Sequence, residues 1–189
     1  MMRHKVSLAA LLAASFLLQG CFPLAVTGMG AAAVMATDRR STGMYIEDEN
    51  IEWRVFARVR NDFPGAHVNA TSYNRRVLLT GEAPNEEMKK KIEEAVRGLL
   101  NVRDVVNELK IAGASSLASR GNDSLVTSNV KARMLNNGKF SPSHIKVLTE
   151  ANVVYLMGLV TPAEADAAVE VARTAQGVSS VVKVFEYIN

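Results

Sequence analysis

The chain has 189 residues, of which 22 are Lys or Arg and 19 are Asp or Glu. Removal of an N-terminal export signal takes Arg3 and Lys5 with it and leaves 20 basic residues against 19 acidic ones. This balance argues against nucleic-acid binding, which needs a larger and clustered basic excess. The single cysteine excludes an intramolecular disulfide.

Residues 1–20 have the layout of a lipoprotein signal peptide. Arg3 and Lys5 form its basic start, and the apolar stretch 6–18 is too short to remain as a membrane-spanning helix. The stretch ends in Leu18-Gln19-Gly20-Cys21, which resembles a bacterial lipobox. The sequence therefore predicts export and acylation. An ordinary signal peptide followed by a chance cysteine is the alternative.

Cys21 is then the acylated, palmitate-bearing first residue of the mature chain. Phe22 stands where an Asp often retains such proteins in the inner membrane, which favours the outer membrane. Residues 22–37 carry no charge, and we expect a flexible tether over 21–46. Ordered structure is expected to begin between residues 38 and 49.

A first structural unit is predicted over residues 47–111. Hydrophobic residues at every fourth position predict a helix whose buried face is Ile51, Val55 and Val59. The remaining expected elements are, in order, a strand at 67–73, an apolar strand at 77–80 that Gly81 ends, a helix capped by Asn85, and a closing strand at 102–111.

The same order returns over residues 123–189, after a linker at 112–122 that is rich in Gly, Ala and Ser. Its first helix is expected to bury Val126, Val130 and Met134. Two strands at 145–149 and 153–157, a helix that starts with the capping box of Thr161 and Glu164, and a last strand at 178–188 are expected to follow.

The chain is therefore predicted to be an α+β protein of two tandem α-β-β-α-β units, each a small mixed sheet covered by two helices. The strand that reaches Gly81 returns 77 positions later at Gly158, as expected of one unit used twice. A unit of about 65 residues buries only about 60% of its chain surface and is marginally stable alone. We therefore expect the two units to pack against each other.

Motifs in both units carry a family resemblance. Each unit has a strand that reaches a glycine, in Leu78-Leu79-Thr80-Gly81 and Tyr155-Leu156-Met157-Gly158, and a Val-x-x-Val-Val closing strand, at 102–106 and 178–182. These units resemble BON domains. Essentially the whole chain resembles the dual BON-domain outer-membrane lipoproteins. Beyond the two units, the motifs that carry this resemblance are the lipobox, Ala36-Thr37-Asp38-Arg39-Arg40-Ser41 and Asn122-Asp123-Ser124.

The resemblance implies a non-enzymatic lipoprotein that faces the periplasm and supports envelope integrity, with a role at division sites. It also implies binding of an anionic phospholipid membrane through the first helix of the second unit. The implied lipid-binding residues are Leu125, Val126, Ser128, Asn129, Lys131, Ala132, Arg133 and Leu135. No cofactor, metal, nucleic acid or small-molecule substrate is expected.

The first helices of the two units differ in charge. Over 47–62, five acidic residues stand against three arginines, a net charge of −2. Over 122–137, Asp123 stands against Lys131 and Arg133, a net charge of +1. Only the second helix therefore suits anionic headgroups, where each Lys or Arg contributes about 1 kcal/mol.

Two apolar side chains lie off the predicted core stripes of these helices. Leu125 is expected to be exposed, where a leucine beside cations suits shallow membrane insertion; packing between the domains is the alternative. The family resemblance implies a tryptophan at this position, and leucine is the weaker interfacial anchor, so we expect weaker lipid binding. Trp53 is expected to pack between the domains or to make a second membrane contact.

The sequence offers no enzymatic or metal site. His67 and His144 lie 77 residues apart at corresponding strand starts, and the mature chain has no further histidine and no free cysteine to complete a metal set. Both are expected to be surface residues at strand edges. Charges of both signs on 86–94 are typical of a solvated helix face.

Two other functions remain open from the sequence. The second unit's first helix or a strand edge could dock an envelope protein, which would make the chain a periplasmic adaptor. A spacer associated with peptidoglycan is the third hypothesis.

Overall fold

The computed structural model describes residues 38–189. The predicted signal peptide, Cys21 and most of the predicted tether lie outside the described residues. Within residues 38–189, no helix combines the length and the hydropathy that a membrane crossing requires.

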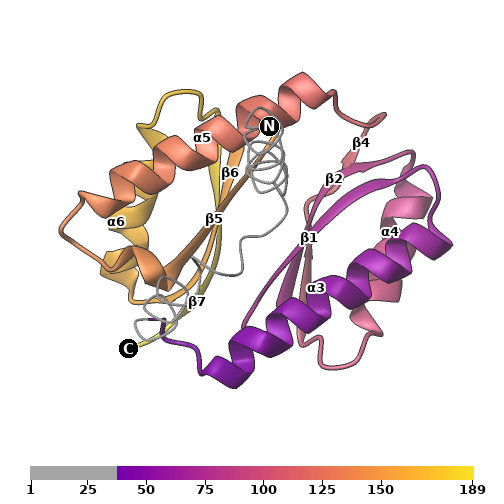
Figure 1. The fold of residues 1–189 in the computed structure, drawn as a ribbon, viewed down its shortest axis with the longest axis horizontal. Coiled ribbons are helices and arrows are strands. Elements are labelled where there is room, and N and C mark those ends of the chain that lie inside the picture. The colour runs from indigo at the N-terminus through magenta and orange to yellow at the C-terminus, as the bar shows by residue number, and fades with distance from the viewer. Residues whose placement is uncertain (1–37) are drawn as a thin grey trace, which may run out of the picture. The chain divides into compact units, whose positions relative to one another are not determined.

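The first half of the described chain has the predicted α-β-β-α-β order (Figure 1). Strand β2 is central, because it pairs antiparallel with β1 and parallel with β3 and β4. The closing strand is split in two at Glu108 and Leu109, although the Glu108 amide still donates to the Leu79 carbonyl oxygen of β2 at 2.9 Å. The elements are α3 (Thr42–Asp62), β1 (His67–Tyr73), β2 (Arg76–Ala83), α4 (Glu86–Arg97), β3 (Asp104–Asn107) and β4 (Lys110–Ile111).

The second half repeats this arrangement. Strand β6 pairs antiparallel with β5 and parallel with β7, so each half holds a small mixed sheet as predicted. The capping box of Thr161 and Glu164 is present at the start of α6. The elements are α5 (Leu117–Leu135), η1 (Pro142–His144), β5 (Ile145–Glu150), β6 (Val153–Val160), α6 (Pro162–Arg173) and β7 (Ser180–Tyr187).

Both long helices start earlier than the sequence patterns indicated. Helix α5 begins at Leu117 rather than near Asp123, because the Ser116 side chain caps it by accepting a hydrogen bond from the Ser119 amide. The linker between the units is accordingly limited to residues 112–116. Ser41 caps α3 in the same way, so ordered structure begins within the expected range.

The repeated glycines do not end their strands, and that prediction was wrong. Strands β2 and β6 continue through Gly81 and Gly158. A Cβ atom would lie 2.2 Å from the His67 carbonyl oxygen at Gly81, and 2.4 Å from the His144 carbonyl oxygen at Gly158. The glycines are needed because the neighbouring strand's backbone approaches closely at these two points.

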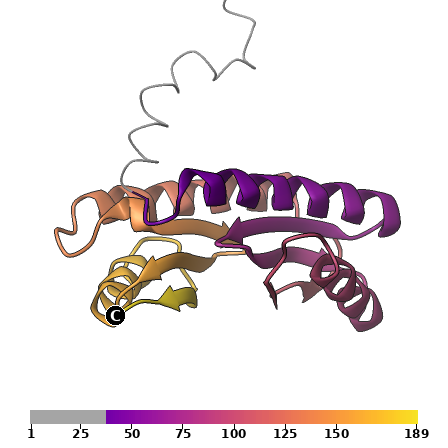
Figure 2. The ribbon, with the colours of Figure 1, turned by 90° about the horizontal axis from the view of Figure 1, so that it is seen from below.

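Each sheet packs its own helices against one face. Buried residues of α3, β2 and α4 form one core, and those of α5, β5, β6 and α6 form another. In Figure 2, α3 and α5 lie along the upper edge of the sheets, and α4 and α6 lie towards the lower edge.

The opposite faces of the two sheets pack against each other, which confirms the expected contact between the units. The centre of this interface is a third apolar cluster, which contains Leu78 from the first sheet and Tyr155 from the second. Side chains alternate along β2 and β6 between this cluster and the helix-covered core. The buried members of the interface cluster are Tyr73, Leu78, Tyr155, Met157 and Val184.

The interface has approximate two-fold character. Tyr73 and Glu150 stand 77 residues apart, as do His67 and His144. The Tyr73 hydroxyl lies 3.4 Å from the His144 carbonyl oxygen at one end of the interface. Glu150 lies beside His67 at the other end. A shift of 77 residues, which superposes one unit on the other, therefore relates the contact of Tyr73 with His144 to the contact of Glu150 with His67.

The segment just before α3 joins both units. Arg39 donates two hydrogen bonds to the Glu164 carboxylate of α6, at 2.7 and 2.9 Å, and one to the Leu159 carbonyl oxygen at 2.8 Å. Arg40 pairs with Asp48 of α3 at 2.8 Å and lies over the Tyr73 ring. The chain thus enters the folded body at the boundary between the units.

Candidate functional site

Helix α5 is held in place by a core stripe and one buried acid. Val126, Val130 and Met134 are buried as predicted. The Asp123 carboxylate accepts hydrogen bonds from the Ala151 and Asn152 amides, at 2.9 and 2.8 Å, in the turn between β5 and β6. Because both turn residues have positive φ, these bonds stabilise a conformation that the backbone alone disfavours.

The first unit contains the same arrangement. The Asp48 carboxylate accepts from the Asn74 and Arg75 amides at 2.8 and 2.7 Å, and from the Ser72 hydroxyl. Both aspartates are buried, so counting them as surface charges was wrong. Without them, the net charge changes from −2 to −1 on the first helix and from +1 to +2 on the second. The charge contrast between the helices is therefore retained.

The outward side of α5 is apolar and uncharged. Leu117, Leu125 and Leu135 are all highly exposed, Leu125 by 72%. The side chains between them on this face are small, as in Gly121, Ser128 and Ala132. Asp123 is the only acidic residue of α5 and is buried. The exposed position of Leu125 rules out the alternative that it packs between the domains.

Cations flank this apolar side. Lys131 and Arg133 are exposed; Arg133 donates to the Thr174 hydroxyl at 2.9 Å, and Lys131 makes no ion pair within residues 38–189. Arg120 instead turns back to bond Ser115. Lysine and arginine have long apolar stems, so their charged groups can reach headgroups while the leucines lie deeper.

The other residues predicted to contact lipid have mixed positions. Val126 is buried in the core and therefore cannot contact a membrane. Ser128 donates to the Ser124 carbonyl oxygen within the helix. Asn129 donates to the Gln176 carbonyl oxygen, and Ala132 is exposed. Cys21 lies outside the described residues.

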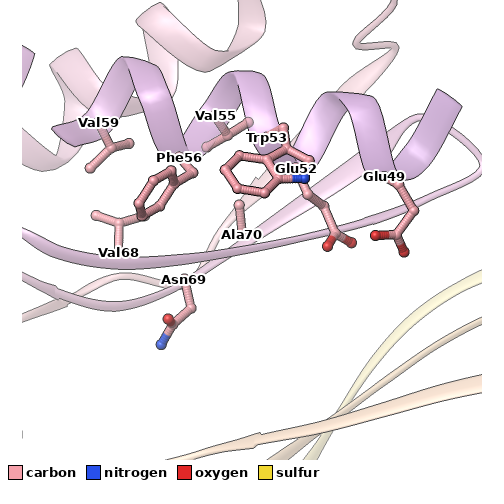
Figure 3. Close-up of a pocket in the computed structure, with 9 residues that line it drawn as sticks. All are labelled: Glu49, Glu52, Trp53, Val55, Phe56, Val59, Val68, Asn69 and Ala70. Atoms are coloured by element: carbon pink, nitrogen blue, oxygen red, sulfur yellow. The ribbon is translucent and has the colours of Figure 1, made fainter. Parts of the chain in front are cut away.

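Helix α3 carries a second exposed apolar surface. Trp53 and Phe56 contact edge to face with ring centroids 5.8 Å apart, and Trp53 is 70% exposed, so the prediction that it packs between the domains was wrong. The two rings border a groove of about 330 Å³ between α3 and β1, floored by Val68 and Ala70 (Figure 3). Glu49 and Glu52 lie at one end of this groove.

A cluster of His67, Glu82 and Glu150 was missed by reasoning from the sequence. Its members come from β1, β2 and β5, and one side-chain N or O atom from each lies within 4.8 Å of the others. The sequence prediction rested on histidine and cysteine ligands, whereas two of these three groups are carboxylates. The signal that could have found this cluster is an acidic residue near the end of each of two strands, Glu82 in β2 and Glu150 in β5.

The chain matches the BON domain family twice, over residues 47–113 and 122–189. It belongs to the BON family. The two matches coincide with the two α-β-β-α-β units, so both the fold class and the family resemblance predicted from the sequence are confirmed.

Two relatives match most of the chain. "Outer membrane lipoprotein DolP" of Haemophilus influenzae is 40% identical over 185 residues, which cover 96% of each protein. "21 kDa hemolysin" of Actinobacillus pleuropneumoniae is 34% identical over 154 residues, which cover 80% of this chain and 79% of that protein. A solved structure of CdsD from Chlamydia trachomatis matches over 76% of this BON protein and 92% of its own chain, with a TM-score of 0.30 and 14% identity.

Proposed function

We propose that this BON protein is a lipoprotein of the outer membrane, anchored through acylated Cys21 and facing the periplasm, that binds anionic phospholipid through α5. In this way it supports envelope integrity, with division sites as its place of action. The relative that is 40% identical over nearly the whole chain bears the name of an outer-membrane lipoprotein, which supports the location. No catalytic role is part of the proposal.

The observation that carries lipid binding is the exposed side of α5. Its three leucines form an apolar row without an acidic neighbour on the helix, beside two exposed cations. An amphipathic helix of this kind binds at the headgroup boundary by shallow insertion and by attraction to anionic lipid. Helix α3 is a poorer candidate, since its aromatic pair lies beside Glu49 and Glu52.

The acyl anchor and α5 have different roles in this proposal. Acyl chains contribute about 0.8 kcal/mol per buried CH₂, whereas Lys131 and Arg133 contribute about 1 kcal/mol each. The anchor therefore keeps the protein on the membrane. Helix α5 decides which side of the folded domains faces the lipid and whether the protein collects in anionic patches.

The test is flotation of residues 22–189, which lack Cys21, with phosphatidylglycerol vesicles and with phosphatidylcholine vesicles. We expect binding to phosphatidylglycerol that falls with added salt. Changing Lys131→Glu together with Arg133→Glu should weaken it by about 30-fold or more, since at least about 2 kcal/mol is lost. Leu125→Ser should weaken it without a change in charge, and Leu125→Trp should strengthen it.

The matched control is Arg58→Glu together with Arg60→Glu, the same charge change on α3. Equal losses in both double variants would show that overall charge, not α5, determines binding, and would contradict the proposal.

No binding to protein-free vesicles would favour the second candidate function, a periplasmic adaptor for an envelope protein. The exposed groove beside Trp53 and Phe56 is the observation that keeps this candidate open.

A further inference from the structure

The cluster of His67, Glu82 and Glu150 lies where the two BON domains meet. His67 and Glu82 belong to the first domain and Glu150 to the second. Both glutamates are buried, each with 6% of its surface exposed. His67 Nδ1 lies 2.8 Å from Glu82 Oε2, and all three candidate ligand atoms lie within 4.8 Å of one another.

The two carboxylates lack a fixed cation. Within residues 38–189, neither Glu82 nor Glu150 pairs with a lysine or an arginine. The other acids at the domain boundary do: Glu52 pairs with Lys146 at 2.8 Å, and Glu186 pairs with Arg103. Buried charge is costly unless it is paired or coordinates a metal. A metal ion between the carboxylates would supply a positive charge.

Hydrogen bonds hold one oxygen of each glutamate and leave the other free. Glu82 Oε2 accepts from the Ser115 amide at 3.2 Å as well as contacting His67. Glu150 Oε2 accepts from the Asn69 side-chain amide at 2.9 Å and from the Thr80 hydroxyl at 3.4 Å. In the described part of the chain, neither Oε1 atom accepts a hydrogen bond. Such support for one oxygen is how ligating carboxylates are oriented in metal sites.

The opposite end of the interface provides an internal comparison. There His144 occupies the position of His67, but Leu159 replaces Glu82 and Tyr73 replaces Glu150. The Tyr73 hydroxyl lies 3.4 Å from the His144 carbonyl oxygen, and the acids near this end have fixed cations, since Glu164 pairs with Arg39 and Asp38 pairs with Arg40. The paired BON domains therefore do not need two buried glutamates at this position to pack together.

We propose that a divalent transition-metal cation of the Zn²⁺ type binds between His67, Glu82 and Glu150 and couples the two domains. One imidazole nitrogen and two carboxylates suit Zn²⁺, whereas Ca²⁺ and Mg²⁺ prefer oxygen ligands alone. Ligands about 2.1 Å from one ion lie at most about 4.2 Å apart, so small side-chain rotations bring these atoms into position. Glu150 and Asn69 also line a groove of about 440 Å³.

Calorimetric titration of residues 22–189 with Zn²⁺ tests the proposal. This part of the chain has two histidines, His67 and His144, and no cysteine. We expect one ion per chain. His67→Gln, Glu82→Gln and Glu150→Gln should each weaken binding by at least about 10-fold. The controls His144→Gln and Glu52→Gln, the latter removing another acid at the domain boundary, should leave binding unchanged.

Thermal unfolding supplies a second measurement. Zn²⁺ should raise the Tm of the unaltered chain and not that of Glu150→Gln, because a ligand that binds only the folded state stabilises it. Circular dichroism of each variant without metal checks that it is folded. Binding weaker than about 100 µM, or equal losses in His67→Gln and His144→Gln, would overturn the proposal.

Discussion

In each domain, the pairing of the first two strands depends on one glycine, Gly81 in the first domain and Gly158 in the second. At Gly81, φ is +106°, and a Cβ atom would lie 2.2 Å from a backbone oxygen that belongs to a paired strand. Neither the strand nor the oxygen can move without loss of sheet pairing. The recurrence of the glycine was visible in the sequence. Its cause was not, because the approach of His67 or His144 depends on pairing between strands.

We predict that Gly81→Ala lowers the free energy of unfolding by about 3 kcal/mol, the combined cost of a left-handed backbone and a forced contact. Urea unfolding of residues 22–189 measures it. Gly113→Ala is the matched control: nothing lies within 4 Å of its Cβ position, so a change within about 0.5 kcal/mol is expected. Equal effects of the two changes would show that the close approach is unimportant.

At the scale of the element, α3 and α5 are each fixed to a hairpin turn by a buried aspartate. Asp48 and Asp123 stand three residues before Ile51 and Val126, in the same core stripe, and this spacing is visible in the sequence. A charged residue on a buried helix face normally indicates a specific partner. The partner amides lie 26 to 29 residues further along the chain, and their positive φ values cannot be read from the sequence.

We predict that Asp123→Asn destabilises the second domain by about 2 kcal/mol, because the uncharged amide has a single acceptor oxygen for two backbone donors. Amide hydrogen exchange at Ala151 and Asn152 should increase together with this loss. Asp62→Asn, which affects an exposed pair with Arg58, should cost about 0.5 kcal/mol or less. If exchange at the turn is unchanged in Asp123→Asn, the aspartate does not hold the turn.

At the scale of the whole molecule, the sequence predicted that the two units pack together but not which faces of their sheets meet. A small unit is marginal alone, which predicted contact between the two. In Val153 to Val160 nearly every side chain is apolar, so alternation could not identify the face that meets the other sheet. The polar contacts at the boundary join residues 70 or more positions apart, and the sequence gives no sign of them.

The link between Arg39 and Glu164 should make domain coupling depend on pH. The hydrogen bonds from Arg39 hold the pKa of Glu164 at about 2, below its ordinary value of 4.5. A lowered pKa means that the stabilisation is complete above about pH 4.5 and is lost as the pH falls towards 2. We predict that the Tm difference between the unaltered chain and Glu164→Gln is constant above pH 5 and shrinks below pH 4.5.

Scanning calorimetry of both chains from pH 7 to pH 2.5 provides this comparison. Glu170→Gln is the control on the same helix, because within residues 38–189 the Glu170 carboxylate pairs with Arg173, three residues away, and with no residue of the first domain. A Tm difference for Glu164→Gln that does not change with pH would contradict the predicted coupling.

The approximate two-fold character of the domain interface has a consequence for how this chain arose. Two identical copies of one BON unit, paired face to face, form a symmetric dimer in which both ends of the interface are the same. Gene fusion removes that constraint, because a substitution in one copy no longer appears twice. One end could then acquire Glu82 and Glu150 while the other acquired Leu159 and Tyr73. Covalent duplication thus allowed a self-pairing surface to develop two different ends.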